Sequence, residues 1–112
     1  MFKLFGGKDI NKGVEEWKNT EGAVLLDVRT AEEYAGRHID GSINIPLDGL
    51  DAIKKSLPDK TTPLFVYCLS GGRSARAAVY LKENGYSRVY DIGGISGYKG
   101  KTVYCGTSSK KI

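Results

Sequence analysis

The chain has only two cysteines, one histidine and one tryptophan in 112 residues, and it lacks long apolar runs. Two cysteines do not make a disulfide framework, which fits a reducing compartment. The longest apolar stretches, such as residues 23–26, are far too short to span a bilayer. Residues 1–8 lack the apolar core and cleavage site of a secretion signal. We therefore expect a cytoplasmic protein that does not bind membranes.

Dense clusters of lysine and arginine interleaved with aromatic residues are also missing, which argues against nucleic acid as a partner. The net charge of +4 is only mildly basic, and it suits the attraction of small anions. The length and the 40% hydrophobic fraction are typical of one globular domain. We expect a single domain over residues 1–112, with a core at about 10–100 and a C-terminal tail at about 101–112.

The most informative stretch is an apolar run that ends on a cysteine and is followed by a glycine-rich loop. Residues 64–67 have the continuous apolar character of a strand buried on both faces, and Cys68 comes next. Residues 75–84 are rich in alanine and predict a helix. A cysteine at such a turn lies near free backbone N–H groups and the positive end of a helix, which favour the nucleophilic thiolate. Gly71 and Gly72 allow several N–H groups to point inward and form an anion-binding loop.

Strands and helices alternate along the rest of the chain, which predicts a parallel sheet with helices on both faces. The expected strands cover residues 23–28, 41–46, 64–67 and 88–92. Helix starts are indicated by caps at Asp9, at Thr30 in a capping box with Glu33, and at Asp48 or Asp51. Ligands of such sheets bind at the carboxyl ends of the strands, where Cys68 is expected.

These segments resemble the motifs of the single-domain rhodanese family. The resemblance rests on residues 26–34, 36–46, 66–74 and 91–98, in the expected order, with Tyr98 where a tryptophan is commoner. It implies an α/β, three-layer fold with a central parallel five-stranded sheet and helices on both faces. It also implies thiosulfate:acceptor sulfurtransferase activity through a cysteine persulfide, by double displacement.

The resemblance and the residues together predict a site at one loop, without a metal or an organic cofactor. The catalytic nucleophile is Cys68. The residues expected to bind the substrate are those that follow it in the loop: Leu69, Ser70, Gly71, Gly72, Arg73 and Ser74. The expected partners are a small sulfur-containing anion as donor and a thiol, cyanide or protein thiol as acceptor.

Several polar residues around the loop have two interpretations each. The Arg73 guanidinium either binds the anion or braces the loop, and Ser74 is interpreted as a helix N-cap. Asp27, Arg29 and Glu33 are interpreted as structural ion pairs around a helix start. An ionised thiolate needs no general base, so the single histidine, His38, is interpreted as structural.

Cys105 is a candidate accessory residue. It is either an incidental thiol in the tail or a thiol that resolves the Cys68 persulfide, as redox-active cysteines do. The sequence does not give the distance between the two sulfurs, and disulfide geometry is demanding.

Two other functions compete with sulfur transfer. A cysteine-dependent phosphatase or arsenate reductase also uses a loop from cysteine to arginine, but with five intervening residues, whereas four separate Cys68 from Arg73. The shorter loop favours a sulfur atom over a tetrahedral phosphoryl group. A non-catalytic interaction module is the other alternative, since a fold does not imply an activity.

Overall fold

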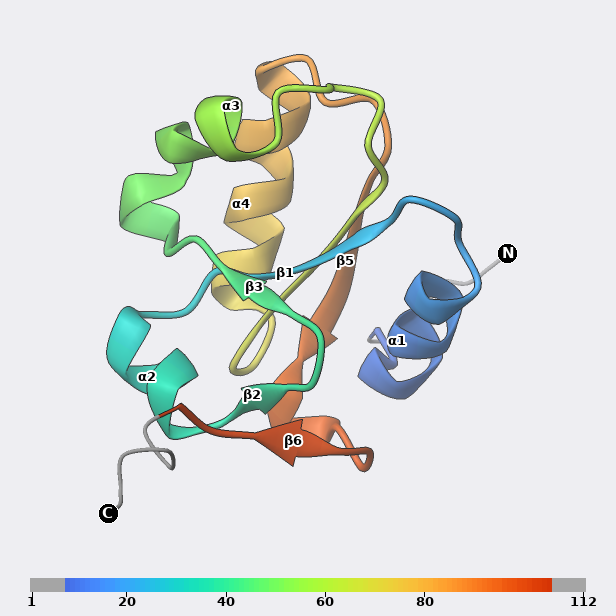
Figure 1. The fold of residues 1–112 in the computed structure, drawn as a ribbon, viewed down its shortest axis with the longest axis vertical. Coiled ribbons are helices and arrows are strands. Elements are labelled where there is room, and N and C mark those ends of the chain that lie inside the picture. Colours follow the sequence, from blue (N-terminus) through green and yellow to red (C-terminus); the bar gives the residue numbers. More distant parts are fainter. Residues whose placement is uncertain (1–7, 106–112) are drawn as a thin grey trace.

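The centre of the fold is a parallel sheet of four strands. The computed structural model describes residues 8–105. The strands are β1 (Val24–Asp27), β3 (Ile43–Asn44), β4 (Leu64–Cys68) and β5 (Val89–Gly94). They lie side by side in the order β3-β1-β4-β5, so β4 is an inner strand and its carboxyl end, Cys68, lies at an inner position of the sheet edge (Figure 1).

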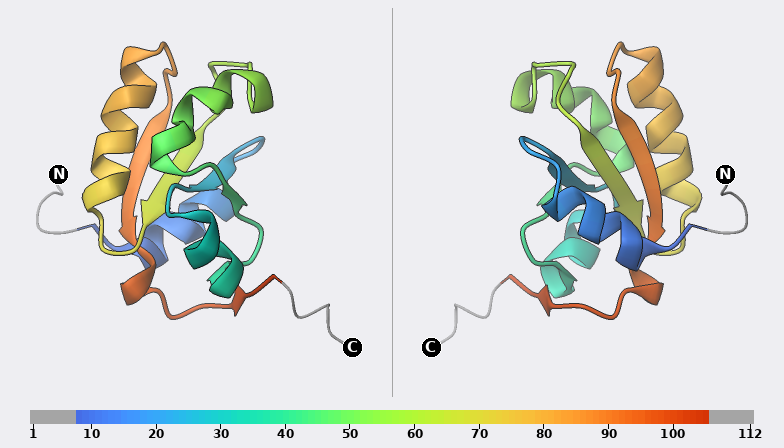
Figure 2. Two further views of the ribbon diagram at one scale, coloured as in Figure 1. Left: turned by 90° about the vertical axis from the view of Figure 1, so that its left-hand side faces the viewer. Right: turned by 90° about the vertical axis from the view of Figure 1, so that its right-hand side faces the viewer.

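Helices cover both faces of this sheet, which confirms the expected three-layer α/β class (Figures 1 and 2). On one face lies α1 (Ile10–Lys18). On the other lie α4 (Gly72–Glu83), α3 (Ile53–Ser56) and the 3-10 helix η1 (Leu47–Ala52). The short helix α2 (Ala31–Gly36) follows β1 and lies near the carboxyl ends of the strands. Within residues 8–105, no helix combines the length and the apolar character needed to cross a membrane.

Both faces of β4 are buried, as the unbroken apolar run predicts. Leu64, Val66 and Cys68 belong to the core beneath α4, whereas Phe65 and Tyr67 belong to the core beneath α1. The strand that carries the cysteine is thus fixed from two sides. This packing holds the start of the glycine-rich loop in a defined place.

The fifth parallel strand that the resemblance implied is a wrong prediction, although the fold class holds. The remaining strands in the described part of the chain, β2 (His38–Ile39) and β6 (Thr102–Val103), pair with each other in antiparallel orientation. The Ile39 amide donates to the Tyr67 hydroxyl at 3.1 Å, so β2 contacts the central sheet through a side chain of β4 and not by strand pairing. Because β6 lies within the expected tail, the fold extends beyond residue 100; residues 106–112 lie outside the described part.

The predicted helix caps are confirmed at the two helix starts where a side chain bonds to a backbone amide. Asp9 caps α1, and Thr30 and Glu33 form the predicted capping box of α2. The prediction of a cap at Asp48 or Asp51 is wrong: this segment is the 3-10 helix η1, and neither η1 nor α3 has a side-chain cap. After β5 the chain forms the short 3-10 helix η2 (Ile95–Gly97).

Candidate functional site

The loop after β4 folds back over the cysteine that ends the strand. Helix α4 begins at Gly72, directly after Gly71, whose φ is +111°. A side chain at this position would be strained, so glycine permits the turn. The turn brings the Gly71 amide to 3.0 Å from the Cys68 Sγ, to which it donates a hydrogen bond. One backbone N–H group of the loop therefore points at this sulfur.

The surroundings of Cys68 favour its ionised form. Burial raises the pKa of the thiol, since the residue is only 1% exposed. The hydrogen bond between Cys68 and the Ser74 side chain and those from the amides of Ser74, Gly71 and Arg73 together lower it more, and the resulting pKa is below the ordinary value. A buried cysteine among aliphatic groups alone would show the opposite shift. The hydrogen bonds of Cys68, from a side chain and from amides together, therefore outweigh the effect of burial on its pKa.

The end of β5 packs closely against the loop that follows Cys68. A Cβ on Gly94 would lie 2.3 Å from the Leu69 carbonyl oxygen and 2.7 Å from the Ser70 Cα. The Ser96 amide donates to the same Leu69 carbonyl at 3.1 Å. The sequence did not predict that Gly94 supports the loop. The signal available in the sequence was the Gly93-Gly94 pair, which marks a close approach of two backbones as readily as a turn.

Arg73 braces the loop through its side chain. Its guanidinium makes two hydrogen bonds to the Glu33 carboxylate, of 2.8 and 3.1 Å, which join α4 to α2. Of the two interpretations of Arg73, the structure therefore favours bracing, and the residue contributes to the surroundings of Cys68 through its backbone amide.

This ion pair makes a testable contribution to stability. The hydrogen bond from Arg73 lowers the pKa of Glu33 from 4.5 to about 2. The stabilisation is therefore complete above about pH 4.5 and is lost as the pH falls toward 2. We expect Glu33→Gln to lower the free energy of unfolding by about 1 kcal/mol or less at pH 6, because both side chains are about one third exposed.

The decrease should be smaller at pH 3 than at pH 6 when both proteins are unfolded with urea. Glu32→Gln, an exposed change in the same helical turn, is the matched control and should show no such pH dependence. A loss for Glu33→Gln that is equal at the two pH values would contradict the assignment.

The polar residues near the loop make structural contacts. Asp27 pairs with Arg29 at 2.8 Å in a buried position, so these two brace the end of β1, while Glu33 pairs elsewhere. His38 stacks on the Tyr34 ring with a centroid distance of 3.7 Å, and its Nδ1 lies 2.6 Å from the Tyr34 carbonyl oxygen. These contacts agree with the structural interpretation of His38.

The prediction that Ser74 is the N-cap of α4 is wrong. The N-cap is Gly71, and Ser74 lies inside the helix. Its hydroxyl instead lies 2.7 Å from Asp91 Oδ1 and 3.6 Å from the Cys68 sulfur. Asp91 was not singled out by the sequence, because its distance from the loop along the chain hides the contact.

Cys105 is exposed, follows β6, and donates its amide to the Ala35 carbonyl oxygen at 2.8 Å. Both cysteines are free thiols, so there is no disulfide between Cys68 and Cys105 in this structure. An accessory role for Cys105 stays a prediction.

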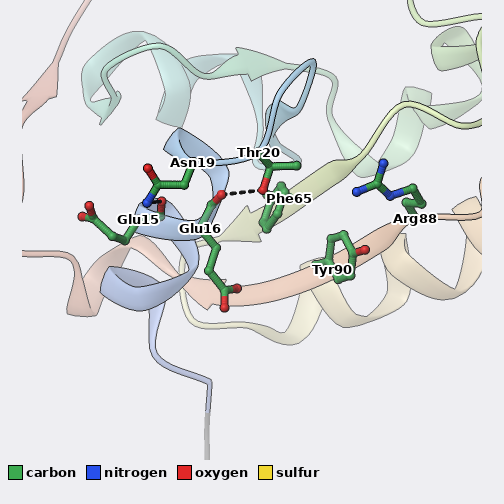
Figure 3. A pocket seen from close by; sticks show the side chains of 7 residues that line it. All are labelled: Glu15, Glu16, Asn19, Thr20, Phe65, Arg88 and Tyr90. Carbon is green, nitrogen blue, oxygen red and sulfur yellow. Dashed lines mark hydrogen bonds between the residues drawn. The ribbon is translucent and has the colours of Figure 1, made fainter.

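Two cavities in the described part of the chain are not lined by Cys68. One of about 400 Å³ lies between α1 and the strands β4 and β5 (Figure 3), where the Thr20 hydroxyl and the Asn19 amide bond to carbonyls of their own helix. It contains none of the predicted site residues. A smaller one, of about 150 Å³, is lined by residues that include Thr30, Asp48, Arg73 and the exposed Arg76. Among residues 8–105, no three His, Cys, Asp or Glu residues are grouped to hold a metal ion.

The fold and the loop together define a class: an α/β domain that presents a cysteine in an amide-lined loop at the carboxyl edge of a parallel sheet. The chain belongs to the rhodanese-like domain family, whose model matches residues 10–101. This confirms the resemblance noted in the sequence.

Individual relatives agree with this membership. Thiosulfate sulfurtransferase PspE from Escherichia coli is 41% identical over 71 residues, which cover 62% of this chain and 68% of PspE. The uncharacterized protein YqhL from Bacillus subtilis is 42% identical over 81 residues, 70% of this chain and 63% of YqhL. The solved structure of a rhodanese with anions from E. coli superposes with a TM-score of 0.68 at 36% identity, over 73% of this chain and 98% of that one.

Proposed function

We propose that the chain is a sulfurtransferase that moves a sulfane sulfur from thiosulfate, or a related donor, to a thiophilic acceptor. Residues 1–112 act as one catalytic domain, and the sulfur is carried as a persulfide on Cys68. The observation that carries the proposal is the Cys68 Sγ at the carboxyl end of an inner strand, 3.0 Å from the Gly71 amide that donates to it. Membership of the rhodanese-like family and the named activity of PspE support the same reaction.

In the first step, the Cys68 thiolate attacks the outer sulfur of thiosulfate. A bond forms between the two sulfurs, and the bond between the outer and inner sulfur of thiosulfate breaks. The electron pair of that bond leaves with sulfite, and the persulfide remains on Cys68. The backbone amides of the loop, from Leu69 to Ser74, stabilise the negative charge on the sulfurs. Arg73 contributes its amide and, through Glu33, the rigidity of the loop.

In the second step, a thiolate or cyanide attacks the terminal sulfur of the persulfide. The bond between the two sulfurs of the persulfide breaks, and the electron pair returns to Cys68 as thiolate. The product is a new persulfide or thiocyanate. This step has the chemistry of thiol–disulfide exchange, and transfer through a covalent intermediate gives ping-pong kinetics.

A steady-state assay tests the proposal against the phosphatase alternative. With thiosulfate and cyanide varied together, we expect parallel double-reciprocal lines, and with an aryl phosphate we expect no turnover above background. Intersecting lines would contradict the covalent intermediate. Turnover of the aryl phosphate but not of thiosulfate would replace the proposal by a phosphatase.

The role of Cys105 can be tested with Cys105→Ser. The residue is exposed, and its described hydrogen bond uses the backbone amide, so the substitution should not disturb the fold. We expect unchanged turnover with cyanide and with small thiols. Slower turnover with thiol acceptors, together with a species linking the two cysteines in mass spectra, would instead assign Cys105 the resolving role.

A further inference from the structure

The Ser74 hydroxyl lies between the Cys68 sulfur and the partly buried carboxylate of Asp91. Its Oγ is 2.7 Å from Asp91 Oδ1, 3.0 Å from the Gly71 carbonyl oxygen and 3.6 Å from the Cys68 Sγ. Ser74 itself is completely buried. A hydroxyl has one proton to donate, so these neighbours compete for it.

Asp91 is the strongest acceptor for the Ser74 proton. Its side chain is only 11% exposed, and its Oδ1 also accepts the Gly93 amide at 3.1 Å, which fixes the carboxylate at the end of β5. A bond to a carboxylate is roughly twice as strong as a bond to a neutral acceptor. The Ser74 proton therefore points to Asp91, and the Ser74 oxygen presents its lone pairs to the thiol.

From this geometry we infer that Asp91 is a positioning residue for sulfur transfer, acting on Cys68 through the hydroxyl of Ser74. While Cys68 is a thiol, its S–H donates to the Ser74 oxygen. When the sulfur is anionic, the hydroxyl must turn, so that its bond to Asp91 breaks and a bond to the sulfur forms. Asp91 thus limits how strongly Ser74 stabilises the anion and keeps the thiolate more basic.

Basicity matters because the intrinsic nucleophilicity of a thiolate rises with the pKa of the thiol. The other charged groups near this trio come from neighbouring elements. The Nζ of Lys8, which precedes α1, lies 3.8 Å from Asp91 Oδ2. Arg73 of α4 interacts electrostatically with Cys68. The catalytic meaning of the inference rests on the proposed sulfurtransferase function, but the pKa of Cys68 can be measured without any sulfur donor.

The test is a double-mutant cycle on the pKa of Cys68, taken from the pH dependence of alkylation by iodoacetamide. Cys105→Ser is the common background, so that one thiol reacts. We expect Asp91→Asn to lower the pKa of Cys68 by about 0.5–1, because a neutral acceptor releases the Ser74 proton more easily. The alkylation rate at the high-pH plateau should fall roughly 1.5- to 3-fold, as expected for a less basic thiolate. Asp51→Asn, an exposed charge change, should alter neither quantity.

The decisive comparison is the same change in Ser74→Ala, where the connecting hydroxyl is gone. In the Ser74→Ala background, Asp91→Asn should shift the pKa of Cys68 by less than half of the shift that it causes when Ser74 is present. An equal shift in both backgrounds would show a direct charge effect and overturn the inference, as would an unchanged or raised pKa in Asp91→Asn alone. If Asp91→Asn fails to fold, Asp91→Ala takes its place with the same expectations. Should the wild type accept no sulfur while the cycle behaves as expected, the proposed function fails and the positioning role stands.

Discussion

Replacement of Cys68 by alanine is expected to abolish sulfur transfer, with a loss of at least about a thousandfold in kcat, because no other group takes the place of the nucleophile. The fold should persist. The cysteine side chain is small, and its truncation in a buried position should cost on the order of 1 kcal/mol. Steady-state assays with thiosulfate and cyanide measure the first effect, and urea unfolding followed by circular dichroism measures the second.

Cys105→Ala is the matched control, since it removes the other free thiol from an exposed position. It should keep the wild-type rate. Retention of thiosulfate turnover by a folded Cys68→Ala protein would contradict the persulfide mechanism outright. A wild-type protein as inactive as this variant would instead favour an interaction module.

The second large effect is expected from Gly94→Ala, which adds a single methyl group. The added Cβ would lie 2.3 Å from the Leu69 carbonyl oxygen, a backbone atom that a side-chain rotation cannot move away. The loop must therefore shift, at a cost of about 1–3 kcal/mol in the free energy of unfolding. If the shift turns one amide away from the sulfur, kcat should fall by about 10²–10³-fold, as for the loss of one donor to a reacting anion.

Gly36→Ala is the control for this prediction. A Cβ there has no heavy atom within 4 Å, and the residue lies in α2, where alanine is favoured over glycine. Its activity should be that of the wild type and its stability equal or slightly higher. If Gly94→Ala keeps full activity while its unfolding free energy falls, Gly94 supports the fold but not the arrangement of the amides.

Much of this organisation could be predicted from the sequence, because the signals were local. The apolar run before Cys68 predicted a strand buried on both faces, and Thr30 and Glu33 predicted the start of α2. The glycines after Cys68 predicted a loop with inward amides, and Gly71 provides one at 3.0 Å. Each of these depends on residues a few positions apart, which spacing alone can reveal.

The contacts that the sequence did not predict join residues far apart in the chain. Nothing near Arg73 indicated that its partner is Glu33, and nothing near Ser74 indicated Asp91. Gly94 supports the loop only because β5 lies beside β4 in the sheet. The fifth parallel strand failed for a similar reason, since β2 pairs with the distant β6 in antiparallel orientation and meets β4 only through a tyrosine side chain. Such pairings depend on the tertiary fold.

Intact-mass analysis of the wild-type protein tests the central claim most directly. After incubation with thiosulfate, mercaptopyruvate or glutathione persulfide in turn, the protein should gain the mass of one sulfur from at least one donor. Peptide mapping should place that sulfur on Cys68, and cyanide should remove it. A protein that gains no sulfur from any of the three donors, and whose Cys68 is alkylated only as fast as an ordinary thiol, would contradict the claim.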